Sequence, residues 1–185
     1  AYNFINSAGM PVNDILLEKE VRNYSITALT GSLGLDMTSN FVEKVSETTF
    51  NTSRTYNPSA ATLTNGNVLI AYSDGGSLNY GTFVIYDPSG NEVVSGTTFN
   101  EGITNSPSAT TLTNGNILIT YSDGGSSNSG NFVIYDSAGK VVKSETTFNA
   151  GATYNPSATT LTNGNVFIAY RDNDNSDYGN FVIYD

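Results

Sequence analysis

Acidic loops that recur along the chain are the residues best suited to chemistry. The stretch Ser73-Asp74-Gly75-Gly76-Ser77 returns as residues 122–126, so Asp74 and Asp123 hold equivalent positions. An Asp among Gly and Ser residues can bind a cation or the hydroxyl groups of a sugar. The same pattern also forms a turn in which Asp hydrogen-bonds its own backbone while Gly supplies a positive φ. We favour the turn and keep Asp74 and Asp123 as ligand candidates.

The third copy of this loop is more acidic. It places Asp172, Asp174 and Asp177 within six residues, a spacing similar to that of oxygen-ligand calcium loops. It lacks the central Gly and the distal Glu of a helix-loop-helix calcium site. We therefore expect a solvated acidic loop, with these three residues as the candidate calcium ligands and Asp172 also as a ligand-binding candidate. No other cofactor is expected.

Tyrosines supply the remaining candidates. Tyr80, Tyr154 and Tyr178 do not recur in every copy and are predicted to lie in loops, where a ring can stack on a sugar and a hydroxyl can bond to it. Other tyrosines recur strictly inside apolar runs, which favours packing between repeats over ligand binding. They are Tyr72, Tyr121, Tyr170, Tyr86, Tyr135 and Tyr184.

Composition excludes several classes of function. The 185 residues carry seventeen acidic and seven basic side chains, a net charge of −10, and such a surface repels nucleic acid. There is no Cys to form disulfides and no His to serve as general base or zinc ligand. No apolar run approaches the ~20 residues of a membrane span. We expect neither nucleic-acid binding nor membrane insertion, and the Thr/Asn/Ser/Gly-rich composition is typical of secreted and surface β-proteins.

The elements that must position these loops repeat every 49 residues, as the spacing of Phe83, Phe132 and Phe181 shows. Each repeat predicts four strands, which in the first copy are residues 59–63, 68–72, 83–87 and 93–99. Asn65-Gly66 between the first two strands predicts a type I′ hairpin turn, because that turn needs positive φ at both central residues.

The two middle strands of each repeat are apolar on both faces, which indicates burial on both sides. In the outer two strands, apolar and polar residues alternate. A four-stranded antiparallel sheet stacked face to face against copies of itself is a β-propeller blade. The predicted fold is therefore all-β, with propeller-like repeats over residues 51–185 whose last copy lacks its fourth strand.

Residues 1–50 are interpreted as a degenerate, shortened repeat or assembly segment. Residues 41–50 match the fourth strand of a repeat, and residues 14–21 have some helical character although the alignment favours a strand. Closed propellers typically have four to eight blades, and three full repeats are too few. Residues 1–50 could supply a partial fourth blade, two chains could combine into a larger ring, or the repeats could form an open or unusually small assembly.

The repeat motif resembles known blades. Its consensus runs Pro-Ser-Ala-Thr-Thr-Leu-Thr-Asn-Gly-Asn, then Ile-Ala-Tyr-Ser-Asp-Gly-Gly, then Gly-x-Phe-Val-Ile-Tyr-Asp. This resembles the ~50-residue β-propeller-type repeats of bacterial secreted and cell-surface proteins and of phage tail and receptor-binding proteins. The resemblance implies an extracellular, cell-surface or virion location and an adhesive role. The chain lacks the Trp and the denser acidic loops of the bacterial blades.

Three functions follow as hypotheses. The leading one is a non-enzymatic surface protein, adhesin-like or lectin-like, that binds glycans or a protein partner through its loops, with avidity from the repeated sites. The alternative is a structural component of a virion or extracellular filament that self-assembles through its repeats and terminal strands. The third is a glycan-cleaving enzyme, which requires two loop carboxylates about 5 to 9 Å apart in one cleft. The expectation at this point is that the protein is not an enzyme.

Overall fold

Ten β-strands account for most of residues 44–185, the part of the chain that the computed structural model describes. Every strand pairing in this part is antiparallel, and it contains no α-helix, so the all-β prediction is confirmed. No helix here is long and apolar enough to cross a membrane. Residues 14–21, which combine some helical character with an alignment that favours a strand, and the degenerate repeat up to residue 43 lie outside the described residues. The strands are β1 (Thr55–Thr62), β2 (Val68–Asp74), β3 (Tyr80–Tyr86), β4 (Glu92–Thr111), β5 (Ile117–Asp123), β6 (Ser129–Tyr135), β7 (Val141–Asn149), β8 (Thr153–Thr160), β9 (Val166–Asp172) and β10 (Tyr178–Tyr184).

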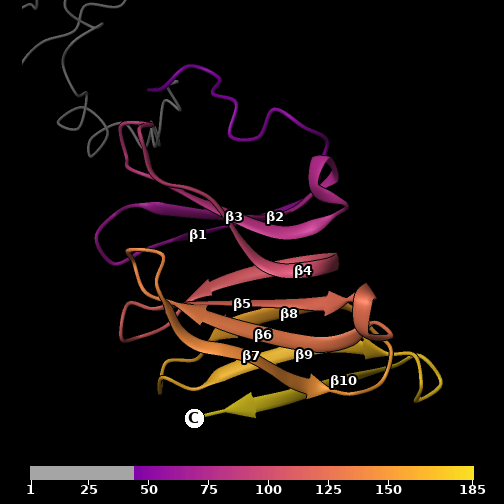
Figure 1. The fold of residues 1–185 in the computed structure, drawn as a ribbon. Coiled ribbons are helices and arrows are strands. Elements are labelled where there is room, and N and C mark those ends of the chain that lie inside the picture. Colours follow the sequence, from indigo (N-terminus) through magenta and orange to yellow (C-terminus); the bar gives the residue numbers. More distant parts are fainter. Residues whose placement is uncertain (1–43) are drawn as a thin grey trace, which may run out of the picture. The chain divides into compact units, whose positions relative to one another are not determined.

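The strands form three consecutive sheets, one for each repeat, of which the first two are joined through β4 (Figure 1). The first sheet is β1, β2, β3 and the first half of β4, and the second is the rest of β4 with β5, β6 and β7. β4 is therefore shared, because the fourth strand of one repeat runs directly into the first strand of the next. The third sheet has only β8, β9 and β10, so β10 is an edge strand within the described residues.

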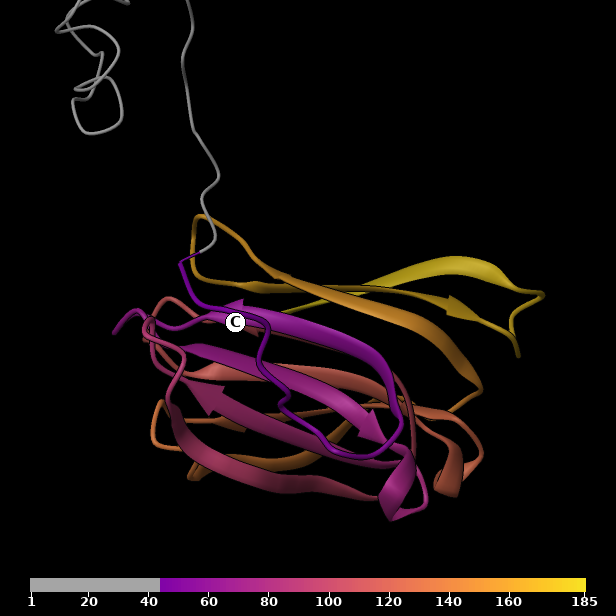
Figure 2. The same ribbon diagram turned by 90° about the horizontal axis from the view of Figure 1, so that it is seen from above.

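Two apolar cores lie between successive sheets. The first joins Phe83 and Ile85 of the first sheet to Ile119 and Tyr121 of the second. The second core joins the other face of the second sheet to the third, and its buried members are Leu118, Phe132, Val166 and Ile168. Seen from above, successive sheets are turned relative to one another rather than overlaid (Figure 2).

Burial of the middle strands follows this stacking. Every residue of β5 is buried, because its odd-numbered side chains enter one core and Leu118 enters the other. The prediction that middle strands are covered on both faces therefore holds for the second repeat. It is wrong for the third, where the side chains of β10 are alternately exposed because no described residue covers its outer face.

The Asn-Gly hairpins differ from the prediction. Gly66 has a φ of +87°, but Asn65 does not have a positive φ. The amide of Gly66 donates to the carbonyl of Leu63 at 2.9 Å, and the amide of Leu63 donates to the carbonyl of Asn67 at 2.8 Å. The turn is therefore type I followed by a left-handed Gly, a three-residue hairpin loop, and the type I′ prediction is wrong. The Asn65 side chain instead accepts from the amide of Asn67.

Candidate functional site

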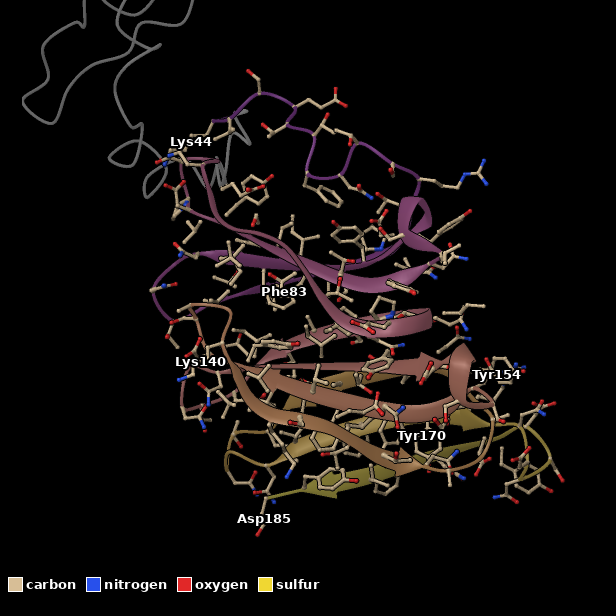
Figure 3. All side chains as sticks on the ribbon, viewed as in Figure 1. Lys44, Phe83, Lys140, Tyr154, Tyr170 and Asp185 are labelled. Carbon is tan, nitrogen blue, oxygen red and sulfur yellow. The ribbon has the colours of Figure 1, made fainter. Side chains whose placement is uncertain are left out.

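One end of the stacked sheets carries all six residues that the sequence named as ligand candidates. We call it the loop end and define it as residues 51–56, 74–80, 100–105, 123–129, 149–154 and 171–178. The start of each first strand pairs with the end of each second strand, as Thr55 pairs with Asp74 and Thr153 with Asp172, so these segments must meet. The short hairpins lie at the opposite end, and Figure 3 shows Tyr154 and Lys140 on opposite sides.

The first two acidic loops are closed by their own carboxylates. Asp74 caps the short 3₁₀ turn Gly75–Ser77, and its carboxylate accepts from the amide of Gly76 at 3.0 Å, the Ser77 hydroxyl at 2.9 Å and the Asn51 amide at 3.2 Å. Burial alone would raise the pKa of Asp74, but these hydrogen bonds favour the charged form and the net pKa is lowered. Asp123 holds the equivalent turn through the amide of Gly125 at 2.9 Å. Both carboxylates thus shape the loops.

The third loop sends its carboxylates to different partners. Asp172 accepts from the Asn180 side chain at 3.0 Å, and Asp174 accepts from the backbone amide of Ala152 at 3.1 Å. Asp177 lies 3.6 Å from Arg171. Within residues 44–185 no three acidic side chains are grouped so that they could hold a metal ion. The geometry offers no support for a calcium site made by these three residues.

The three candidate tyrosines lie at the starts of strands, so the prediction that they lie in loops is wrong, and they are spread over two repeats. Tyr80 is half-buried at the start of β3, whereas Tyr178 at the start of β10 is 62% exposed. Tyr154 lies in β8, with the guanidinium of Arg171 stacked 4.5 Å from its ring centre. Only Tyr154 combines an aromatic face with an adjacent cation. All of the strictly recurring tyrosines except Tyr86 pack against phenylalanines instead, as Tyr135 does with Phe83 at 4.7 Å.

A second arginine–tyrosine pair occupies the first repeat and was missed by the sequence analysis. Arg54 donates to the hydroxyl of Tyr56 at 3.0 Å, and Tyr56 is 39% exposed. Tyr56 and Tyr154 are equivalent residues two repeats apart. Arg54 and Arg171 come from different parts of their repeats, so no periodic signal links them. They are nonetheless the only arginines among residues 44–185, and that rarity could have marked them as candidate binding residues from the sequence.

A bulge in each first strand sets the orientation of these tyrosines. The register shifts between Tyr56 and Ser59 and between Tyr154 and Ser157, where the chain passes through Asn57 or Asn155 with positive φ and then a Pro. Pro is tolerated here because a bulge leaves a ladder position without a hydrogen bond. Successive first strands are in direct contact, as the Ser106 hydroxyl donates to the side chain of Asn155 at 3.2 Å, and the two tyrosines lie on first strands that are separated by one other first strand.

Exposed carboxylates share this end of the molecule. Glu101, Asp174 and Asp177 are all exposed in loop-end segments. The Glu101 side chain forms no hydrogen bond with any other residue of 44–185, so its carboxylate is available to a ligand. The loop end therefore combines aromatic faces and guanidinium groups with at least one unengaged carboxylate, a set of groups that can bind sugar rings, anionic substituents and protons.

Comparison with known proteins gives structural neighbours only. No protein-family model and no curated protein matches the chain. Similar solved structures include an α-L-arabinanase from Penicillium chrysogenum complexed with arabinobiose, with a TM-score of 0.49 and 20% identity over 78% of this chain and 45% of that one. A Hadza microbial sialidase has a TM-score of 0.47 and 12% identity over 70% and 30%. A polysaccharide lyase, an ulvan lyase, has a TM-score of 0.45 and 14% identity over 66% of this chain and 35% of that one. This chain spans less than half of each of these proteins.

These neighbours correct the functional expectation. The sequence pointed to a non-enzymatic surface binder, with a virion or filament component as the alternative, and to the absence of enzymatic activity. The three neighbours named above are instead an arabinanase, a sialidase and a polysaccharide lyase, all of which are carbohydrate-active enzymes. On this comparison the expectation of a non-enzymatic protein is corrected, and the likeness, at 12 to 20% identity, is one of fold.

Proposed function

We propose that this chain forms blades of a β-propeller protein that processes polysaccharides, with the loop end as the surface that binds the substrate. The propeller-type repeat and a location outside the cell, where polysaccharides are found, are parts of this proposal. The observation that carries it is the presence of two arginine–tyrosine pairs, Arg54 with Tyr56 and Arg171 with Tyr154, at one end of the stacked sheets.

The chemistry of these pairs suits a sugar chain with anionic groups. A tyrosine ring offers an apolar face to a sugar ring, and a guanidinium binds a carboxylate or sulfate through paired hydrogen bonds. The protein is strongly acidic, yet both of its arginines within 44–185 stand at this end. Two separate anchors favour an oligosaccharide, which can contact both, over a monosaccharide.

Bond cleavage requires an acid or base near the bound chain. Glu101 lies in the segment 100–105 of the second repeat, between the repeats that carry the two arginine–tyrosine pairs, and its carboxylate is unengaged within the described residues. We assign it the role of acid or base candidate. Asp74 and Asp123 are less suited, because their oxygens already accept hydrogen bonds that hold the loops.

The test is a substrate panel on the full chain. Polyuronates, a sulfated polysaccharide and neutral arabinan are incubated with the protein, and new reducing ends and unsaturated ends are measured. We expect cleavage of an anionic polymer, which E101Q should reduce by about 10²-fold or more, in line with the usual contribution of acid–base catalysis. R54A and R171A should raise KM more than they lower kcat.

The control variant is K140A, which removes a cation from the opposite end of the molecule (Figure 3). It should leave both binding and cleavage unchanged. If no polymer is cleaved by the wild type, the enzymatic proposal fails. If R54A, R171A and K140A weaken binding equally, the loop end is not the binding surface.

A further inference from the structure

The outer faces of the first and third sheets are complementary. We call the outward face of the third sheet, with Ser157, Phe167 and Phe181, the trailing face. We call the outward face of the first sheet, with Ala60, Ile70 and Tyr86, the leading face. Phe83 and Phe132, which are equivalent to Phe181, are 0% and 3% exposed, whereas Phe181 is 61% exposed. The trailing face therefore has the side chains of an inter-sheet core but no described sheet covering it.

One hydrogen bond between neighbouring sheets recurs at equivalent positions, with a backbone amide as donor and a serine hydroxyl as acceptor. The hydroxyl of Ser59 accepts from the amide of Ala109 at 3.0 Å, and the hydroxyl of Ser108 accepts from the amide of Ala158 at 3.2 Å. The next acceptor in this series is Ser157 on the trailing face, and the matching donor is the amide of Ala60 on the leading face. Neither is used for this bond within residues 44–185.

Aromatic contacts repeat in the same way. Phe83 packs on Tyr135 with ring centres 4.7 Å apart, and Phe132 packs on Tyr184 at 5.2 Å. Phe181 is left without its tyrosine, and Tyr86 is left without its phenylalanine. A hollow of about 320 Å³ lies beside Tyr86, between it and Val45, Phe50 and Gly90. At the equivalent place between the first and second sheets, the ring of Phe83 lies against Gly139.

Residues 45–50 make two side-chain contacts typical of a fourth strand, although they pair with no strand of the described structure. The hydroxyl of Thr48 donates to the carbonyl of Ser46 at 2.9 Å, as the Thr97 hydroxyl does to the Ser95 carbonyl in β4. Phe50 packs on Tyr72 at 5.3 Å, as Phe99 packs on Tyr121 and Phe148 on Tyr170 at 5.2 Å. The chain thus offers one unpaired fourth-strand segment at residues 45–50 and one sheet without a fourth strand at β10.

We propose that the trailing face docks the leading face of a second copy of this chain, and that residues 45–50 of that copy pair with β10 as its fourth strand. Two copies related head to tail bring together six of the described repeats, a number within the four to eight blades that closed rings use. Two identical contacts then close a symmetric dimer and leave no sheet edge at β10. Tyr56 remains 39% exposed with the second sheet already stacked beside it, whereas Tyr154 and Arg171 line the hollow on the trailing face and are partly covered in the dimer.

A glycine gives the sharpest test. A Cβ at Gly81 or Gly130 would lie 2.4 or 2.5 Å from the fourth-strand phenylalanine of its own sheet, whereas a Cβ at Gly179 would meet nothing within 4 Å. In the dimer, Phe50 of the second copy takes the position above Gly179. G179A should therefore leave the unfolding of a single chain unchanged and weaken dimer formation by about tenfold or more. G96A, whose new methyl meets only Thr82 at 3.7 Å, is the matched control.

The measurement is the native mass of the full chain over a range of concentrations. We expect twice the 19.6 kDa of one chain for the wild type and G96A, and a single chain for G179A and F181E at the same concentration. A wild type that stays monomeric at all concentrations overturns the proposal. That result is expected if residues of the same chain or of a longer chain cover the trailing face. An open-ended series of masses overturns the two-copy ring.

Cross-linking then identifies the surface. The chain has no cysteine, so the double variant A60C/S157C can form a disulfide only between the two introduced thiols or between copies. Oxidation should give a reducible dimer from the double variant and none from A60C or S157C alone. A wild-type dimer whose A60C/S157C variant does not cross-link associates through another surface, and the proposal is then wrong.

Discussion

Gly130 is a position at which the packing of the strands makes a specific demand on the sequence. A Cβ at this residue of β6 would lie 2.5 Å from two ring carbons of Phe148 and 2.7 Å from the hydroxyl of Thr153. The ring cannot move freely, because Phe148 packs on Tyr170 at 5.2 Å and borders the second core. Forcing a methyl into such a site typically costs ~1 to 3 kcal/mol.

The expected effect of G130A is a net loss of stability. Ala in place of Gly in a strand gains about 0.5 to 1 kcal/mol from reduced chain entropy, so the net loss should be about 1 to 2 kcal/mol. For a chain of this size that corresponds to a fall in Tm of about 2 to 8 °C. Urea unfolding at one fixed protein concentration measures it, with an unchanged m-value showing that the unfolded state is the same.

G96A serves as the control, because its methyl meets only ordinary contact with Thr82 at 3.7 Å. It should be neutral or slightly stabilising. A G130A variant as stable as the wild type would show that Phe148 does not lie over β6 as described, and the packing argument would be refuted. Equal losses in G130A and G96A would refute it too, since only strand propensity would then matter.

Three further outcomes are expected. G66A should lose about 1 to 2 kcal/mol by urea unfolding, because φ is +87° there and an L-residue is strained in the left-handed region; unchanged stability would contradict the turn assignment. The pKa values of Asp74 and Asp87 are lowered, so the stability they contribute is present above about pH 4 and is lost as the pH falls further; melting curves should show this loss reduced in D87N. Burial, the hydrogen bond to Glu145 and nearby negative charges raise the pKa of Tyr121, so stability should fall as the pH rises above about 10, and by less in Y121F; equal alkaline slopes would argue against a buried phenol.

Much of the fold could be predicted from the sequence, because strand patterning is local. The 49-residue period placed the strands of all three repeats, and the all-apolar run at Ile117–Tyr121 correctly predicted burial on both faces of β5. The hairpin type was wrong because Asn-Gly fits more than one turn. The type I turn with a left-handed Gly66 also suits the sequence, and the closing bond between Leu63 and Asn67 selects it.

The candidate site was predicted only in part. The sequence identified Tyr154 and the acidic loops, but it could not show that Asp74 is engaged by Gly76, Ser77 and Asn51. Arg54 and Arg171 were missed because they occupy unrelated positions in their repeats. They become equivalent only when the folded chain places each beside a tyrosine of a first strand.

The sequence by itself determined which residues form strands and that these strands stack, since side-chain alternation and the repeat period are properties of the chain alone. Tertiary structure decided which faces are covered and which groups meet. Phe83 and Phe181 occupy the same place in the repeat, yet one is buried and the other is 61% exposed. Burial depends on the neighbouring sheet, and no property of a single repeat specifies whether that neighbour is present.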